Sequence, residues 1–173
     1  MRSRPADFVT ENTIIERPSL TPEIALHLAT EVTPLWFATA DTLAKAGTEP
    51  PFWAFAWPGG QALARYVLDN LNIVMGRHVL DISTGSGIVA IAAAKFGAAT
   101  VTANDVDPLS LAAVALNAEL SDVTLTTNGQ DLTDVPFPQE WNVVLAGDVF
   151  YDHKMAARFS PWLRARAAGA PWC

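Results

Sequence analysis

The chain has 173 residues, of which 50% are hydrophobic and 17% charged, and this length and apolar content fit one domain with a real core. Its formal net charge of -7, without a basic stripe, argues against duplex nucleic acid as the partner. The single cysteine, Cys173, excludes a disulfide framework or a cysteine-built zinc site within this sequence.

The N-terminal part of the chain is predicted to be an arm followed by helices. Residues 1–20 are polar and contain two prolines, which favours an extended arm. Residues 21–23, Thr-Pro-Glu, have the form of a helix start, and apolar residues recur at every fourth position from 24 to 32. A second helix is expected over about 34–46.

An unusual aromatic segment follows. Residues 50–60 place four aromatic side chains among prolines and glycines, which a regular helix or a central strand tolerates poorly. We expect an ordered loop that leads into a helix over about 59–70, with Leu63, Tyr66 and Val67 facing inward. Residues 21–70 would then form a unit of helices and aromatic loop ahead of the core.

From residue 71 onward the pattern alternates between strand and helix, which predicts an α/β fold with a doubly wound, parallel sheet. Right-handed crossovers bring the carboxyl ends of all strands to one rim, where ligands of such sheets bind. The expected strands are 78–82, 100–104, 123–126 and 141–146, and the expected helices are 88–96, 108–120 and 153–168.

A glycine-containing loop, residues 83–87, follows the first of these strands. Glycine lets a ligand approach the backbone closely. The dinucleotide fingerprint G-x-G-x-x-G is missing, and Asp81 lies just before the turn, where it would oppose a pyrophosphate but suit an ammonium group. S-adenosylmethionine has an amino group and no phosphate. The alternative is an ordinary turn between strand and helix.

Carboxylates follow the next two strands. Asp105 ends the second strand, where it could accept both ribose hydroxyls of a nucleoside. The alternative for such an acid is a helix cap, a role that fits Asp107, just before Pro108, better. Asp131 follows the third strand and could read the adenine edge, or be a plain turn acid.

The segment after the fourth strand is where a methyl acceptor would lie. Asp148 could hold an acceptor amine and Tyr151 could flank it. The alternative is a helix-capping aspartate and a half-buried tyrosine. Apolar walls would lower the pKa of the amine by desolvation. We expect these walls from three aromatic residues: Trp53, Phe55 and Phe150.

Two blocks of sequence carry a family resemblance: Trp57–Leu63, W-P-G-G-Q-A-L, and Gly147–Asp152, G-D-V-F-Y-D. With the glycine loop and the segment 103–108, they make the chain similar to the seven-β-strand protein lysine methyltransferases, most closely those that modify the electron transfer flavoprotein β-subunit. The similarity extends over roughly residues 8–170. The resemblance implies a Rossmann-like, three-layer αβα sandwich with strand order 3-2-1-4, built from residues 71–173.

The same resemblance implies S-adenosylmethionine as cofactor and a role for each site residue. Trp57 would close over the cofactor, Asp105 would take its ribose, and Asp148 and Tyr151 would form a D-x-x-Y motif facing the target lysine. The other implied cofactor-binding residues are Asp81, Thr84, Gly85 and Gly87 around the amino acid part, with Asp131 and Gly147 on the rim.

The sequence departs from the family in two places. Ser83 stands where the family's loop begins with glycine, which is tolerable if its φ is negative. The sequence also ends at residue 173, where the family continues into further strands, so we expect a truncated member that lacks the later strands.

The expected partner is a protein substrate, with the electron transfer flavoprotein β-subunit as the first candidate. We expect no nucleic acid, no membrane and no metal, and a cytoplasmic bacterial monomer. Members also resemble proteins described as nicotinamide N-methylases, so methylation of a small amine is an alternative that would need a closed pocket. The other alternative is a non-catalytic, truncated pseudoenzyme, which would bind the cofactor without turnover.

Overall fold

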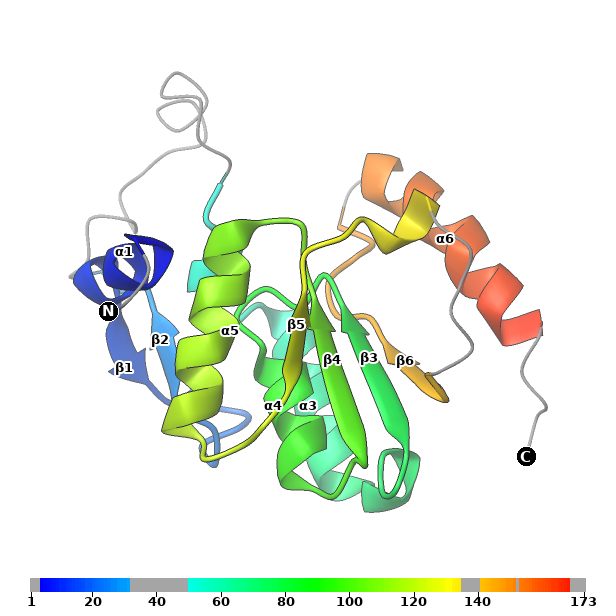
Figure 1. Cartoon of the computed structure of the whole chain (residues 1–173), viewed down its shortest axis with the longest axis horizontal. Helices are drawn as coiled ribbons and strands as arrows, with labels where there is room; N and C mark the ends of the chain where they lie inside the picture. The colour runs from blue at the N-terminus through cyan, green and yellow to red at the C-terminus, as the bar shows by residue number, and fades with distance from the viewer. Residues whose placement is uncertain (1–3, 32–49, 135–140, 152, 169–173) are drawn as a thin grey trace.

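The computed structural model describes residues 4–31, 50–134, 141–151 and 153–168. The first of these ranges forms a helix and a hairpin (Figure 1). These are α1 (Arg4–Asn12) and the antiparallel strands β1 (Ile14–Glu16) and β2 (Leu26–Leu28). The predicted extended arm and the predicted helix from residue 21 are therefore both wrong.

Tertiary contacts explain these two errors. α1 folds against a helix of the core and buries Val9 completely, and this contact stabilises a helix that its polar sequence did not suggest. Ile24 and Leu28 are four residues apart, which fits a helix, but Leu26 between them is also buried while His27 is only partly so. The buried, partly buried, buried pattern of residues 26–28 is that of the short strand β2. The predicted helix over 34–46 lies outside the described residues.

The core is a four-stranded parallel sheet in the order β5-β4-β3-β6, which confirms the Rossmann-like prediction and its strand order. The third strand begins three residues later than predicted. Val123 instead closes the end of the preceding helix, where its N–H donates to Ala118 O at 3.1 Å. The strands are β3 (His78–Ile82), β4 (Thr100–Asn104), β5 (Thr126–Asn128) and β6 (Val143–Leu145).

Helices cover both faces of this sheet (Figure 1). Along β3, Val79 packs into a cluster with the helices of one face, whereas Leu80 and Ile82 pack with α6 on the other. This alternation is the signature of a strand buried on both sides. The first face carries α3 (Pro58–Asp69), α4 (Ile88–Lys95) and α5 (Pro108–Leu120); the second carries α6 (His153–Ala168). Short 3-10 turns lie at η2 (Phe52–Ala54), η3 (Leu71–Ile73) and η4 (Leu132–Asp134).

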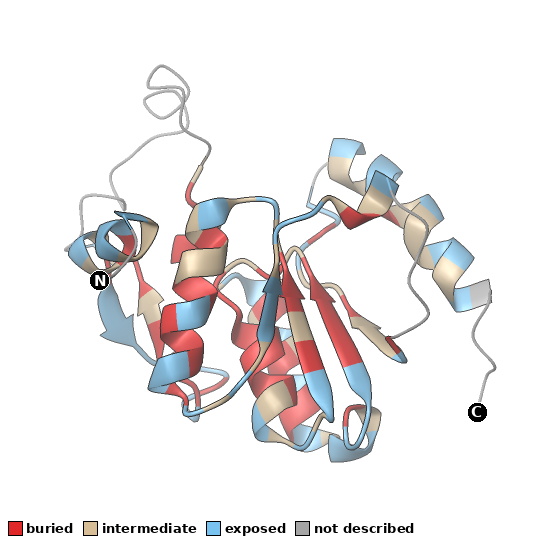
Figure 2. Cartoon of the chain, in the orientation of Figure 1, coloured by how far each residue is buried: buried red, intermediate tan, exposed pale blue. Residues whose placement is uncertain are grey.

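Burial is greatest in the centre of the molecule, as Figure 2 shows for β3, β4 and α4, while β1 and β5 are largely exposed. α3 begins at Pro58, which suits the first turn of a helix. Its inner face includes Val67, as predicted, but Tyr66 is 56% exposed and does not face inward. No helix in the described ranges is both long enough and apolar enough to cross a membrane.

Candidate functional site

The glycine loop between β3 and α4 lies at the carboxyl rim of the sheet. Gly85 and Gly87 both have positive φ values, +55° and +83°. A Cβ on Gly87 would come within 3.1 Å of Val114 Cγ2, and one on Gly85 would face the backbone of Phe52 and Trp53 at 4.0 Å. Ser83 has a φ of +54°, so the condition under which a serine is readily tolerated at this position is not met. The loop therefore holds a non-glycine residue in the left-handed region.

Asp81 organises this loop from within the core. Its side chain is buried, and Oδ2 accepts hydrogen bonds from Thr84 Oγ1 at 2.5 Å and from Ala90 N at 3.0 Å. Burial raises the pKa of Asp81 to about 7, and the charge of Asp105 adds to this, while the two hydrogen bonds act in the opposite direction. Asp81 and Thr84 thus bind each other and tie the loop to α4.

Asp105 joins the glycine loop to the loop after β4. Its Oδ2 accepts from Gly85 N at 3.0 Å and its Oδ1 from Asp107 N at 3.1 Å. The carboxylate is partly exposed, and each oxygen has a second lone pair for a ligand. Asp107 accepts from Leu109 N at 2.8 Å and caps α5, as the alternative for this residue predicted.

Two buried polar residues of α5 support the glycine loop from below, and sequence reasoning missed both. Ser110 Oγ donates to Gly85 O at 2.8 Å, and Asn117 Nδ2 donates to Ser86 O at 2.8 Å. Asn117 Oδ1 also accepts from His27 N at 2.7 Å, which connects the loop to the N-terminal hairpin. The sequence feature that could have identified them is a pair of polar residues, two helical turns apart, on the inner side of an otherwise apolar helix.

Asp131 is engaged by its surroundings. Its Oδ1 accepts from Thr133 N at 3.1 Å and from Thr133 Oγ1 at 2.7 Å, and its Oδ2 forms an ion pair with Arg158 of α6. Partial burial raises the pKa of Asp131, but these hydrogen bonds and the Arg158 charge outweigh it and hold the pKa below its usual value. The side chain thus acts as the turn acid of the alternative interpretation, and Arg158 was not anticipated.

Asp148 lies on the N-terminus of α3, a helix far away in sequence. Its Oδ1 accepts from Gly59 N at 3.0 Å and its Oδ2 from Gly60 N at 2.5 Å. A Cβ on Gly147 would lie 3.1 Å from Gly60 Cα, so this rim loop and the helix start approach closely. The two sequence blocks with the strongest family resemblance therefore meet in space.

Aromatic rings from the segments on either side of this contact pack against one another. We call Phe52, Phe55, Trp57 and Tyr151 the aromatic cluster: ring centroids of Phe52 lie 6.1 Å from Trp57 and 5.6 Å from Tyr151, and Phe55 lies 5.7 Å from Trp57. Trp57 Nε1 donates to Phe52 O at 2.8 Å, which fixes the ring orientation. Tyr151 is 59% exposed rather than half-buried, and Trp53, expected as a wall of the site, is only 1% exposed and belongs to the core.

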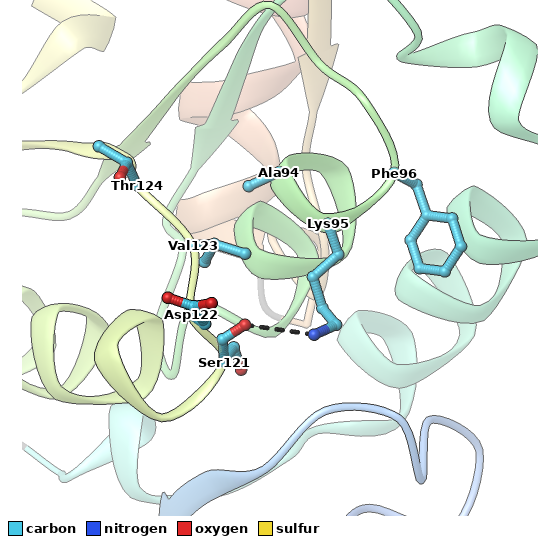
Figure 3. Close-up of a pocket in the computed structure, with 7 residues that line it drawn as sticks. All are labelled: Ala94, Lys95, Phe96, Ser121, Asp122, Val123 and Thr124. Atoms are coloured by element: carbon cyan, nitrogen blue, oxygen red, sulfur yellow. Dashed lines mark hydrogen bonds between the residues drawn. The ribbon is translucent and has the colours of Figure 1, made fainter.

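Of two hollows formed by the described residues, one lies away from the rim site and the other adjoins it. The hollow of Figure 3 is lined by residues from the ends of α4 and α5, where Lys95 Nζ donates to Ser121 O at 3.2 Å. The ends of these helices lie at the opposite edge of the sheet from the rim, and none of the predicted site residues lines it. A groove of about 620 Å³ between the N-terminal hairpin and Trp57 adjoins the aromatic cluster. Within the described ranges, no three acidic, histidine or cysteine side chains gather as a metal site would require.

Comparisons with known proteins identify methyltransferases as relatives of this chain. Residues 61–148 match the family model of the Ribosomal protein L11 methyltransferase (PrmA). The chain is 41% identical to the human electron transfer flavoprotein beta subunit lysine methyltransferase, over 91% of this chain and 59% of the human protein. It is 35% identical to the Caenorhabditis elegans homolog, over 92% of this chain and 70% of that protein.

A solved structure shares the fold over most of the chain. The Thermus thermophilus 16S rRNA methyltransferase, solved with AdoMet and guanosine, superposes on 89% of this chain and 38% of its own with a TM-score of 0.60 at 17% identity. That identity supports the fold alone. The chain spans about 60% of the length of the vertebrate relatives it matches. The identity to these relatives and the coverage of the nematode homolog together show that the chain belongs to the electron transfer flavoprotein beta subunit lysine methyltransferase family.

Proposed function

We propose that this chain binds S-adenosylmethionine at the carboxyl rim of its sheet and transfers the methyl group to a lysine side chain of a protein. The substrate we propose is the β-subunit of electron transfer flavoprotein, the protein named in its relatives. The observation on which the proposal depends is the hydrogen bond from Gly85 N to Asp105. It joins the loop after β3 to the loop after β4, so that the two loops can form a single binding site for the cofactor.

The charges of the rim fit this cofactor. Two aspartates with exposed or partly exposed carboxylates, Asp105 and Asp148, follow strands at the rim, and a third, Asp131, is paired with Arg158. Carboxylates in these positions repel a pyrophosphate, which argues against a dinucleotide, and attract a sulfonium and an ammonium group.

Individual residues would hold different parts of the cofactor. The partly exposed Asp105 carboxylate would accept the ribose hydroxyls. Backbone groups of the Gly85–Gly87 turn would hold the amino acid part, and Asp81 would act through that turn because its own side chain is buried. The backbone around Asp131 would meet the adenine edge. When bound, the cofactor supplies an electrophilic methyl group.

The acceptor lysine would enter beside Asp148. An amine must be deprotonated and in line to react, and the ordinary lysine pKa is about 10.4. The exposed Asp148 carboxylate would accept an N–H of the amine and orient it, while Tyr151 and Phe52 shield it from water. Positioning of this kind supplies about 7–11 kcal/mol in favourable cases, so a strong base is not required.

The test is a transfer assay with a radiolabelled methyl donor and purified electron transfer flavoprotein β-subunit. We expect label on lysine of that protein, and no label on free nicotinamide or small amines. Asp148→Ala should nearly abolish transfer while calorimetry still detects cofactor binding. Label on small amines alone would favour the small-molecule alternative, and binding without any transfer would favour the pseudoenzyme. If calorimetry detects neither the donor nor its demethylated product, the proposal fails.

A further inference from the structure

The Asp148 carboxylate is held by main-chain groups rather than by side chains. Its two oxygens accept from the N–H groups of Gly59 and Gly60 at 3.0 and 2.5 Å, in the first turn of α3. Main-chain donors inside a helix cannot rotate away, and the positive end of the helix dipole favours an anion there. The carboxylate is therefore fixed in direction while it remains exposed to the rim.

This contact is possible because Gly59 and Gly60 have no side chains. A Cβ on Gly59 would lie 2.5 Å from Asp148 Oδ1 and 2.8 Å from its Cγ, closer than any real contact allows. A Cβ on Gly60 would meet Asp148 Oδ2 at 3.4 Å, which is an ordinary contact. Asp148 itself has a φ of +55°, a conformation that aspartate and asparagine adopt at lower cost than most residues with a Cβ.

We propose that Gly59 and Gly60 are positioning residues for methyl transfer: their amides aim the Asp148 carboxylate at the acceptor amine. The inference rests on the proposed function and adds a role for the W-P-G-G block that acts through Asp148. It also predicts that an asparagine cannot replace Asp148, because the side-chain NH2 of asparagine would face one of the two main-chain N–H donors.

The two glycines give a graded test on the full chain. Gly59→Ala pushes the carboxylate away, and a misplacement of about 1 Å can lower a rate roughly 100-fold, so we expect a fall of that order in kcat. Gly60→Ala should lower kcat only about three-fold, because its Cβ fits. Ala62→Ser, on the exposed side of the same helix, should leave kcat unchanged. Cofactor affinity should stay at the wild-type value in all three variants, and Tm should fall slightly in Gly59→Ala alone, which loses the hydrogen bonds to Asp148.

A wild-type kcat in Gly59→Ala overturns the proposal. So does a loss of kcat that is accompanied by an equal loss of cofactor affinity and Tm, because that result indicates a merely structural role. Asp148→Asn gives a second kinetic check, and wild-type turnover in that variant also contradicts the proposal.

Nuclear magnetic resonance supplies a readout that does not need turnover. The amide signals of Gly59 and Gly60 should both move upfield in Asp148→Ala, because each amide then loses its carboxylate acceptor. If the wild-type chain transfers no methyl group, the proposed function fails, and this comparison of amide signals still decides whether the carboxylate is held. Amide signals that ignore the Asp148→Ala change overturn the inference.

Discussion

The main-chain N–H of Gly85 donates to the carboxylate of Asp105 at 3.0 Å and thereby connects the loop after β3 with the loop after β4. The same glycine uses its carbonyl oxygen to accept from Ser110 Oγ of α5 at 2.8 Å. Both polar groups of one glycine are thus bonded to neighbouring segments. The cradle proposed for the cofactor is preorganised by these bonds, so a change at Asp105 affects both the ligand contact and the loop.

Asp105→Ala should weaken S-adenosylmethionine binding about 10- to 100-fold. A hydrogen bond to a charged group contributes about 1.5–3 kcal/mol, and the variant loses the ribose acceptor as well as the Gly85 tether. Isothermal calorimetry measures the change. The matched control is Asp107→Ala, which removes the cap of α5 and should cost about 1 kcal/mol of stability with little change in affinity. Equal effects of the two variants on affinity would contradict the assignment.

Ser83→Gly should stabilise the chain by about 0.5–1 kcal/mol. The φ of +54° at Ser83 is unfavourable for a residue with a Cβ and costs about 1–2 kcal/mol of stability. Glycine removes this cost but also raises the conformational entropy of the unfolded chain, which cancels part of the gain. Urea denaturation measures the difference, and Ser83→Val should shift stability in the opposite direction. An unchanged or lower stability of Ser83→Gly would show that the serine side chain contributes something that its backbone angle does not reveal.

The fold was predictable where local signals and burial agree. The segment from β3 to α5 was predicted within one residue, because a buried strand, a glycine turn and a capped helix each have their own pattern. The N-terminal segment could not be predicted in this way. The spacing of Ile24 and Leu28 fits a helix as well as a strand, and α1 is stabilised by contacts with α5. Such contacts join residues about a hundred positions apart, and no local pattern contains them.

The candidate site shows the same division. The positions of Asp105, Gly85 and Gly87 at the rim could be predicted because strand ends and glycines mark the rim of a parallel sheet. The partners that fix the acids were not found: Arg158 for Asp131, and the first turn of α3 for Asp148. Each of these contacts depends on how a distant helix packs. The sequence thus indicated which residues lie at the rim, and the structure adds which groups bind each carboxylate.

Asn117→Ala should destabilise the chain by about 2–4 kcal/mol and also weaken cofactor binding. The fully buried side chain makes two hydrogen bonds, and its loss leaves Ser86 O and His27 N without this partner. Denaturation and calorimetry on the same variant measure both effects. Asn70→Ala is the control, because its single bond to Tyr66 O is exposed and its loss should cost well under about 1 kcal/mol. An Asn117→Ala variant that melts like Asn70→Ala would contradict the bridging role.

The buried carboxyl of Asp81 should make stability depend on pH in a defined direction. Burial raises its pKa to about 7 from an ordinary value of 3.8, so between these values the folded chain binds a proton that the unfolded chain has released. Its contribution to stability is therefore fully present below the ordinary pKa and is lost as pH rises towards 7, with a slope of at most about 1.4 kcal/mol per pH unit.

Asp81→Asn isolates this contribution. The asparagine oxygen still accepts from Thr84 and Ala90 but does not titrate, so the stability of the variant relative to wild type should increase from about pH 5 to about pH 7 and then level off. Urea denaturation at about pH 5, 6, 7 and 8 measures this difference. Glu119→Gln, which removes an exposed carboxylate, controls for the change in net charge. A difference between Asp81→Asn and wild type that is constant across this range would mean that Asp81 is ionised throughout, and that its hydrogen bonds outweigh its burial.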